Sequence, residues 1–367
     1  MVRTVDPETL AAELLSGDRP ALVDVRPAAD AAGWTLDGDG VTTVNVPAVG
    51  VLDPPHAAAD QVPAGSVLVC TRGRMATAVA QALPEKDLRV LDGGLRAWIG
   101  LLLPHRVDVG VDGLTVLQVQ RPGRGCLSYV LVADGEALVV DPAPHPDAYV
   151  ALAAEHGARI VGVLDTHLHA DHLSGARALA AAADARHVVP AATVDRGVAF
   201  TPDATVADGE TLTLGAHDLR VVALPGHTTD MTGLLVGDRA ILSGDSLFAD
   251  GIARPDLEVG DLERSRAMAR TLHATLRHQI LSLPGDAILL GGHAHPGLRA
   301  GAVAPTLDAV RAAVPELALA DPEAFADELL RAMPPRPANY EAVIEANAGR
   351  TDPDPELESG GNSCSSR

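Results

Sequence analysis

The sequence predicts an α/β protein, with a parallel-sheet domain followed by a layered domain of mixed strands. The chain has 367 residues, which is enough for two hydrophobic cores. Over residues 1–100, short apolar runs alternate with helical segments, as they do in a buried parallel sheet. From residue 110 onward the apolar runs come in closely spaced pairs, which indicates antiparallel strands.

Residues 1–100 are expected to form the first domain. Asp6-Pro7 is a helix start signal, and a helix is predicted over 9–15. A second helix is predicted over 75–83. Four short apolar runs are expected to be the strands, at 21–25, 44–46, 66–70 and 88–91.

Residues 110–300 are expected to form the second domain, joined to the first by a linker at 101–109. The tight turn Asp134-Gly135 predicts a hairpin. Strands are predicted at 114–120, 128–133, 137–141, 160–165, 187–189, 212–214, 219–224, 232–236, 239–243 and 287–290. Helices are predicted at 146–156, 175–183 and 261–283, with a C-terminal helical extension at 301–350. Residues 351–367 are acidic and then rich in Gly and Ser, and are expected to be a mobile tail.

Composition and charge exclude several classes of protein. The formal net charge of −21 repels nucleic acid and anionic membrane surfaces, so neither is expected as a partner. We expect no membrane span, because no apolar stretch approaches about 18 residues, and we find no signal-peptide pattern. The three cysteines, Cys70, Cys126 and Cys364, are few and odd in number, which favours a reducing cytoplasm over a disulfide framework.

A cluster of metal-binding residue types follows the strand predicted at 160–165. The run THLHADH at 166–172 places three histidines and one aspartate within six residues. Three more such residues, each flanked by small residues, follow the ends of separate strands. Open α/β sheets usually place ligands at strand ends. The sequence therefore predicts one metal site, with candidate ligands His167, His169, Asp171, His172, His227, Asp245 and His293.

These motifs resemble the metallo-β-lactamase superfamily over roughly residues 107–300. The resemblance rests on THLHADH together with PGHT at 225–228, SGD at 243–245 and GGH at 291–293. It implies an αββα sandwich with two metal positions. The first position would take His167, His169 and His227. The second would take Asp171, His172 and His293, and Asp245 would bridge the two.

The ligand set permits two kinds of chemistry. A zinc site, especially a binuclear one, would generate a hydroxide for hydrolysis of an ester, thioester or amide. A single Fe(II), one per chain, bound by two histidines and a carboxylate, would leave open positions for O₂. His167, His227 and Asp245 would supply that iron triad. All seven ligands are present, so the ligand list leaves one iron and one or two zinc ions equally open.

Cys70 lies where a predicted strand meets a predicted helix. The helix N-terminus and the nearby Arg72 and Arg74 would stabilise a thiolate there. The Cys70 loop, with LVDVR at 22–26, VNVP at 44–47 and LDGGLRAW at 91–98, resembles the rhodanese family across residues 1–100. That resemblance implies that Cys70 carries sulfur as a persulfide and that the two arginines bind substrate. The chain departs from the family at Met75, where the family often has Arg or Ser.

A rhodanese-like domain beside this metal site favours a persulfide substrate. The stretches 165–172, 243–256 and 125–129 are similar to the persulfide dioxygenases, which have the metallo-β-lactamase fold and use mononuclear iron. Arg254 matches a family arginine near the active site, although an ion pair with Asp256 or Asp250 would also explain it. The resemblance implies that a low-molecular-weight thiol persulfide such as glutathione persulfide reacts with O₂ and water to give thiol and sulfite.

Two other functions stay open at this point. One is a zinc-dependent thioester hydrolase of the glyoxalase II type, which would use the full ligand set. The other is a sulfur-relay or sensing module, in which Cys70 is the working residue and the metal is structural. Structural zinc sites are usually closed and rich in thiolates, unlike this His/Asp set. The sequence leaves open the thiol carrier, the direction of sulfur transfer, the roles of Cys126 and Cys364, and the oligomeric state, with a homodimer as one option.

Overall fold

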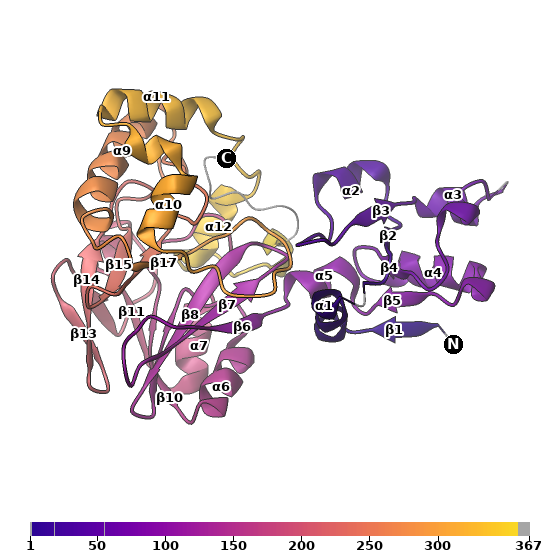
Figure 1. Cartoon of the computed structure of the whole chain (residues 1–367), viewed down its shortest axis with the longest axis horizontal. Helices are drawn as coiled ribbons and strands as arrows, with labels where there is room; N and C mark the ends of the chain where they lie inside the picture. The colour runs from indigo at the N-terminus through magenta and orange to yellow at the C-terminus, as the bar shows by residue number, and fades with distance from the viewer. Residues whose placement is uncertain (1, 18, 55, 359–367) are drawn as a thin grey trace.

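The computed structural model describes residues 2–17, 19–54 and 56–358, and these form two lobes (Figure 1). The smaller, N-terminal lobe holds a five-stranded sheet. The larger lobe holds a seven-stranded sheet and a second five-stranded sheet. The predicted α/β class, with a parallel sheet at the N-terminus, is confirmed.

The sheet of the first lobe has the strand order β1-β5-β4-β2-β3, and every neighbouring pair is parallel. Its strands are β1 (Arg3–Val5), β2 (Leu22–Asp24), β3 (Thr43–Asn45), β4 (Val67–Val69) and β5 (Arg89–Leu91). Its helical segments are α1 (Pro7–Ser16), α2 (Ala28–Gly33), α3 (Ala48–Leu52), η1 (Ala59–Gln61), α4 (Arg74–Ala82), η2 (Pro84–Lys86) and α5 (Gly94–Ile99). The expected start signal is confirmed, because the Asp6 carboxylate accepts a hydrogen bond from the Thr9 N–H at 2.7 Å.

Gly94 lets α5 approach the loop that follows Cys70. A Cβ atom at this position would lie 2.2 Å from the Cys70 carbonyl oxygen, which is too close for any other residue. Its φ of +65° also favours glycine. The start of α5 therefore packs directly on the Cys70 loop.

The segment 101–109 is not a plain linker. It contains β6 (Leu103–Val107), which pairs antiparallel with β7 (Thr115–Arg121) at the edge of the seven-stranded sheet. The polar residues His105 and Arg106 interrupt the apolar run there, because an edge strand with one exposed face needs no continuous apolar stretch. The segment therefore belongs to the larger lobe.

The larger lobe has four layers, helices on either side of two packed sheets. The seven-stranded sheet has the order β12-β11-β10-β9-β8-β7-β6, and the other has β13-β14-β15-β16-β17. The remaining strands are β8 (Cys126–Ala133), β9 (Glu136–Val140), β10 (Arg159–Leu164), β11 (Arg186–Pro190), β12 (Ala204–Val206), β13 (Thr211–Leu214), β14 (His217–Ala223), β15 (Thr232–Val236), β16 (Ala240–Gly244) and β17 (Ile288–Gly291). The predicted hairpin is confirmed between β8 and β9, where Asp134 and Gly135 both have positive φ.

Three apolar cores hold these layers together. Val116 and Leu131 of the larger sheet pack with Leu234 and others of the second sheet, in the core between them. On one outer face lie α6 (Pro146–Glu155) and α7 (Ala176–Ala183). On the other lie α9 (Leu262–Thr275), α10 (Leu307–Ala313), η4 (Pro315–Ala318) and α11 (Pro322–Ala332). The short helix α8 (Ala191–Asp195) follows β11.

The C-terminal part differs from two expectations. The helix predicted over 261–283 is α9 followed by a π-helical turn, η3 (Leu276–Ile280). The expected mobile tail begins with an ordered part, since η5 (Pro355–Glu358) packs so that Glu358 is buried. α12 (Tyr340–Asn347) precedes it, and residues 359–367, with Cys364, lie outside the described residues.

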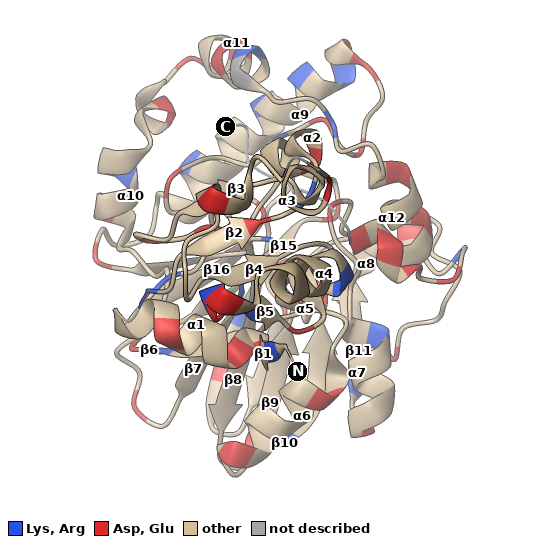
Figure 2. Ribbon diagram, turned by 90° about the vertical axis from the view of Figure 1, so that its right-hand side faces the viewer, with Lys and Arg blue, Asp and Glu red and all other residues tan. Residues whose placement is uncertain are grey.

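Acidic side chains outnumber basic ones. Acidic side chains are prominent on α1 and α12 (Figure 2), in keeping with the net charge of −21. Among the described residues, none of the helices is long and apolar enough to cross a membrane.

Candidate metal centre

The seven predicted ligands come together at one end of the sandwich. The run from His167 to His172 follows β10, whereas His227, Asp245 and His293 follow β14, β16 and β17. All seven residues are buried, none more than 7% exposed. The structure therefore brings the seven predicted ligands together at the ends of these strands.

The first metal position consists of His167, His227 and Asp245. The ligand atoms of these residues lie within 4.8 Å of one another. The Nε2 atoms of His167 and His227 are 4.0 and 3.8 Å from the Asp245 Oδ2. All three atoms are buried and have no hydrogen-bond partner among the described residues. Since an unpaired buried polar atom is costly, these residues fit a bound metal ion.

His169 offers a fourth donor atom. Its Nε2 lies 3.2 Å from the Asp141 carboxylate, and its Nδ1 is buried with no hydrogen-bond partner in the described part of the chain. Burial lowers the pKa of His169, but the Asp141 carboxylate outweighs this and raises the pKa well above its usual value. Metal binding at Nδ1 would therefore have to displace a proton.

Asp141 and Thr166 set the proton position on His167. The Thr166 hydroxyl donates to the Asp141 Oδ2 at 2.8 Å, so it can only accept from the His167 Nδ1–H, 3.0 Å away. The His167 Nε2 is then left with its lone pair for a metal. Burial, followed by repulsion from His169 and His227, lowers the pKa of His167 well below its usual value, which keeps this ring neutral.

Asp141 was not among the predicted site residues. It follows β9, the strand next to β10, and adopts φ +52°. One of its carboxylate oxygens also accepts the Thr166 N–H at 2.7 Å. The sequence carried a signal for it, an aspartate at the end of an apolar strand, but nothing in the sequence joined that strand to the histidine run.

We expect Asp141→Asn to weaken metal binding about 10–100-fold, the usual effect of removing a group that orients a ligand. An amide that donates to the Thr166 hydroxyl would turn its proton toward His167 and protect the wrong nitrogen. Equilibrium titration of the metal-free protein with the metal would measure this. Asp218→Asn is the matched control, because Asp218 is exposed and accepts a threonine hydroxyl, that of Thr213. Equal metal affinity of the two variants would contradict the role given to Asp141.

Arg254 has a different environment from the one expected of a substrate-binding residue. Its guanidinium is fully buried and donates to Asp256 at 2.7 and 3.1 Å and to the carbonyls of Pro334 and Pro335. Its own carbonyl oxygen accepts the His227 Nδ1–H at 2.7 Å. These contacts support a positioning role, in which Arg254 ties His227 to the C-terminal extension. Substrate binding by Arg254 stays a prediction.

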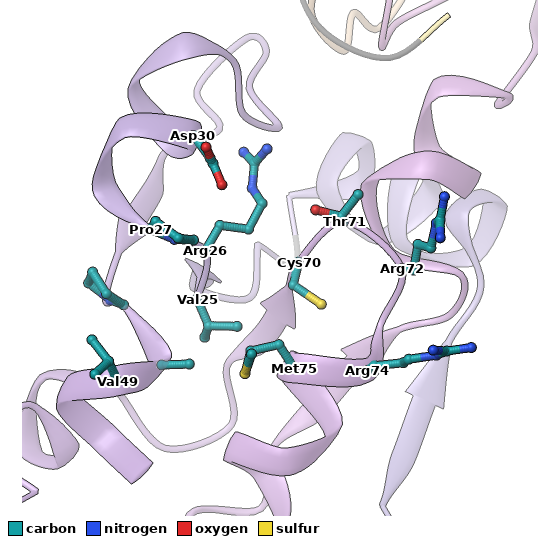
Figure 3. Close-up of a pocket in the computed structure, with 12 residues that line it drawn as sticks. Val25, Arg26, Pro27, Asp30, Val49, Cys70, Thr71, Arg72, Arg74 and Met75 are labelled. Atoms are coloured by element: carbon teal, nitrogen blue, oxygen red, sulfur yellow. The ribbon is translucent and has the colours of Figure 1, made fainter. Parts of the chain in front are cut away.

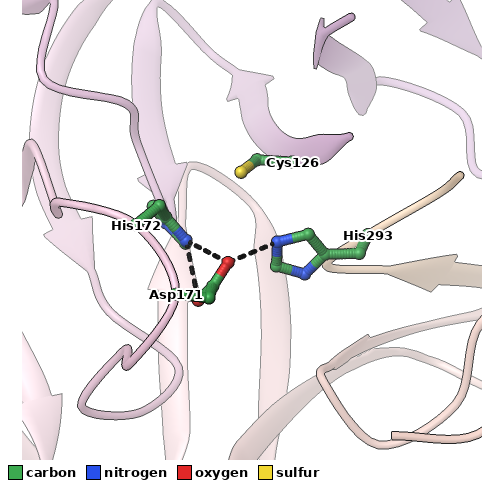
Figure 4. A group of neighbouring side chains, drawn as sticks. All are labelled: Cys126, Asp171, His172 and His293. Atoms are coloured by element: carbon green, nitrogen blue, oxygen red, sulfur yellow. Dashed lines mark hydrogen bonds and ion pairs between the residues drawn. The ribbon is translucent and has the colours of Figure 1, made fainter. Parts of the chain in front are cut away.

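The second metal position differs in how its atoms are paired. His293 places Nδ1 2.7 Å from Asp245 and Nε2 2.9 Å from Asp171. The His172 Nδ1 lies 3.0 Å from both Asp171 oxygens, so that Asp171 sits between the two rings (Figure 4). These residues therefore pair with one another.

Cys126 joins this second group and was not predicted to do so. Its sulfur lies within 4.8 Å of the ligand atoms of Asp171, His172 and His293. Burial raises the pKa of Cys126, but His172 and His293 outweigh burial and lower it to about 5. An isolated antiparallel β-bridge between the backbones of Cys126 and His293 brings the start of β8 to the second metal position. This contact joins distant segments, so it leaves no local signal in the sequence.

The C-terminal extension holds the backbone of the histidine loop. The Asn347 side-chain amide donates to the carbonyls of His169 and His172 at 3.0 and 2.8 Å. The Glu358 carboxylate accepts the Leu173 N–H at 2.7 Å and pairs with Arg121. Segments far apart in sequence thus fix the loop that carries four ligands.

Cys70 lies in the other lobe, at the end of β4. It is buried, and a cavity lies beside it (Figure 3). Arg72 and Arg74 line the same cavity, and the Arg72 guanidinium pairs with Glu356 at 2.8 Å. The structure brings these three predicted residues together, while their roles in sulfur transfer and substrate binding stay predictions.

The chain is similar to known metal-dependent proteins over the region that contains this site. Residues 121–293 match the sequence profile of the Metallo-beta-lactamase superfamily. The chain is 41% identical over 132 residues to the Hydroxyacylglutathione hydrolase of Anaeromyxobacter dehalogenans, covering 36% of this chain and 50% of that protein. It is 26% identical over 237 residues to the mitochondrial Persulfide dioxygenase ETHE1 of Mus musculus, covering 61% and 84%. The chain therefore spans only half the length of the first relative.

Two solved structures have similar folds. One is a Metallo-beta-lactamase from Staphylococcus aureus, with a TM-score of 0.59 and 25% identity over 65% of this chain and 74% of that one. The other is ETHE1 from Myxococcus xanthus, with a TM-score of 0.55 and 25% identity over 64% and 97%. Residues 121–293 thus match the Metallo-beta-lactamase superfamily, and the similar proteins include both persulfide dioxygenases and hydroxyacylglutathione hydrolases.

Proposed function

We propose that this chain is an iron-dependent persulfide dioxygenase that converts a low-molecular-weight thiol persulfide, O₂ and water to thiol and sulfite. Its N-terminal lobe would act as a sulfurtransferase that carries persulfide on Cys70. One observation carries the proposal, the difference between the two metal positions. His167, His227 and Asp245 each keep an unpartnered donor atom, whereas His293 has both ring nitrogens beside carboxylates. This difference favours the first position as the one that binds the metal, and the proposed centre is mononuclear.

A mononuclear centre of two histidines and one carboxylate suits Fe(II). When bound, iron would supply the redox chemistry that joins oxygen to the persulfide sulfur. His167, His227 and Asp245 would hold it, and Thr166 keeps the proton of His167 on Nδ1, away from the metal. These three residues are at most 1% exposed, so bulk water is excluded and the charges act in a medium of low dielectric.

The extent of similarity also supports the dioxygenase. The match covers 84% of the mouse ETHE1 protein and 78% of the human one. It covers 50% and 63% of the hydrolases from Anaeromyxobacter dehalogenans and Acidiphilium cryptum. Similarity to the dioxygenases therefore extends over more of their length.

A zinc-dependent thioester hydrolase of the glyoxalase II type is the second candidate. The 41% identity to a hydroxyacylglutathione hydrolase, although over a shorter segment, favours it. So does the presence of every ligand of a binuclear site. This candidate predicts hydrolysis of S-lactoylglutathione without consumption of O₂.

Metal analysis combined with an oxygen electrode tests the choice. We expect about one iron per chain, O₂ uptake with glutathione persulfide, and sulfite as product. Cys70→Ser should leave this uptake intact, because Cys70 lies in the other lobe. Two zinc ions per chain, turnover of S-lactoylglutathione and no O₂ uptake would instead establish the hydrolase and refute the dioxygenase.

A further inference from the structure

A cavity of about 490 Å³ lies beside Cys70 in the first lobe (Figure 3). Its volume is typical of a small-molecule site. Cys70 is 4% exposed, and its Sγ accepts a hydrogen bond from the Ala76 N–H at 3.4 Å, in the first turn of α4. The sulfur is thus held in the wall of a site that is large enough for a small organic molecule.

The walls of this cavity are largely apolar. Two large apolar side chains at its rim, Val49 and Met75, are 65% and 48% exposed. In Figure 3, Met75 lies on the same side of Cys70 as Val25 and Val49. The apolar lining residues are Val25, Pro27, Pro47, Ala48, Val49 and Met75. A ligand that covers Val49 and Met75 with an apolar group would remove their surface from water, which is favourable.

Two of the three cationic residues that line the cavity, Arg26 and Arg72, are already paired with carboxylates. The guanidinium of Arg26 lies 2.6 Å from the buried carboxylate of Asp24. The guanidinium of Arg72 pairs with Glu356, and that of Arg74, at the start of α4, lies on the opposite side of Cys70 from Val25 and Val49 (Figure 3). Asp30 adds a negative charge to the lining. An inorganic anion would lose its hydration here and would have to compete with carboxylates for Arg26 and Arg72.

We propose that the Cys70 cavity takes the persulfide of an organic thiol with an apolar, uncharged carbon group, in preference to an inorganic donor such as thiosulfate. The proposal rests on the sulfurtransferase role proposed above for Cys70. The Cys70 thiolate attacks the outer sulfur of the donor, and the new S–S bond forms as the bond between the two donor sulfurs breaks. The organic sulfur leaves as the thiol, taking the proton of the donor persulfide. The sulfane sulfur stays on Cys70, and no oxidant or reductant is needed.

Alkylation of Cys70 tests the cavity without requiring sulfur transfer. Iodoacetate, iodoacetamide and N-benzyl iodoacetamide share one reacting group and differ in charge and apolar surface. Their rates at Cys70 would be measured by mass spectrometry of the Cys70 peptide and divided by their rates with a free thiol. We expect the benzyl reagent to exceed iodoacetamide about tenfold, in the range for one apolar group in a pocket, and iodoacetate to be slowest.

A lysine at the cavity rim should reverse this order. Met75→Lys is expected to remove the roughly tenfold benzyl preference and to speed up iodoacetate. Val194→Lys is the matched control, since Val194 is an exposed residue of α8 in the other lobe. The proposal is overturned if iodoacetate reacts as fast as the neutral reagents, or if both lysine variants change the order equally.

Sulfur transfer is tested separately with benzyl persulfide and thiosulfate as donors. We expect the Cys70 peptide to gain one sulfur atom faster from benzyl persulfide. No gain from either donor, together with an intact benzyl preference in alkylation, would refute the sulfurtransferase role and not the apolar character of the cavity. Faster gain from thiosulfate would refute the donor preference itself.

Discussion

His227→Ala is expected to abolish metal retention and activity. It removes one of the three unpartnered donor atoms of the first position, together with the hydrogen bond that the His227 Nδ1–H donates to the Arg254 carbonyl. Groups that only orient a ligand already contribute about 10–100-fold to metal affinity, so loss of a ligand should cost more than ~100-fold. Metal content after dialysis and the rate of O₂ uptake would measure it.

The control is His278→Ala, which removes an exposed histidine of η3 in the same lobe. It should leave both the metal content and the rate unchanged. A His227→Ala protein that keeps its metal would show that the triad is assigned to the wrong residues. The fold described for the lobe does not depend on this assignment and would still hold.

Glu358→Ala is expected to lower the free energy of unfolding by about 3–5 kcal/mol, the usual cost of removing one partner of a buried ion pair. The substitution leaves the guanidinium of Arg121, 3% exposed, without its carboxylate, and the Leu173 N–H without its acceptor. Burial raises the pKa of Glu358, but Arg121 and Arg124 outweigh burial and lower it. Its contribution to stability is therefore present above the unfolded pKa and is lost as the pH falls through the folded pKa.

Urea unfolding of Glu358→Ala and of Glu356→Gln compares the loss of a buried ion pair with the loss of a surface ion pair. The Glu356 side chain is half-exposed and pairs with Arg72 and Arg96, so its loss should cost no more than about 1 kcal/mol. Because Glu358 also holds the histidine loop, its variant should bind metal more weakly as well. Similar unfolding curves for the two variants would disprove a buried role for Glu358.

Most of the fold could be predicted because buried strands carry continuous apolar runs. The runs at β2, β4 and β10 are buried along nearly their whole length and were found from the sequence. β1 has only three residues, two of them exposed, and the apolar run of β6 is interrupted by His105 and Arg106. Strands at the edges of sheets are fixed by pairing with a distant partner, and such a partner leaves no local pattern.

The residues of the site likewise fall into those that the sequence could predict and those that it could not. The ligands lie in short motifs at strand ends, so their identity could be predicted from neighbouring residues. Asp141, Cys126 and Asn347 reach the site from separate segments, and only the folded topology brings them there. The sequence also showed an arginine at 254, but not that its side chain would be enclosed by Asp256 and the Pro334 carbonyl.

The contacts of Asn347 and Glu358 also bear on the order of events during synthesis. Asn347 follows His169 by 178 residues, and Glu358 follows Leu173 by 185. At the usual rates of translation, roughly 10–35 s separate these residues as they leave the ribosome. All seven ligands are thus synthesised before Asn347 and Glu358, which fix the backbone of the loop that carries four of them. A metal ion captured before then would meet a loop that still lacks these backbone partners.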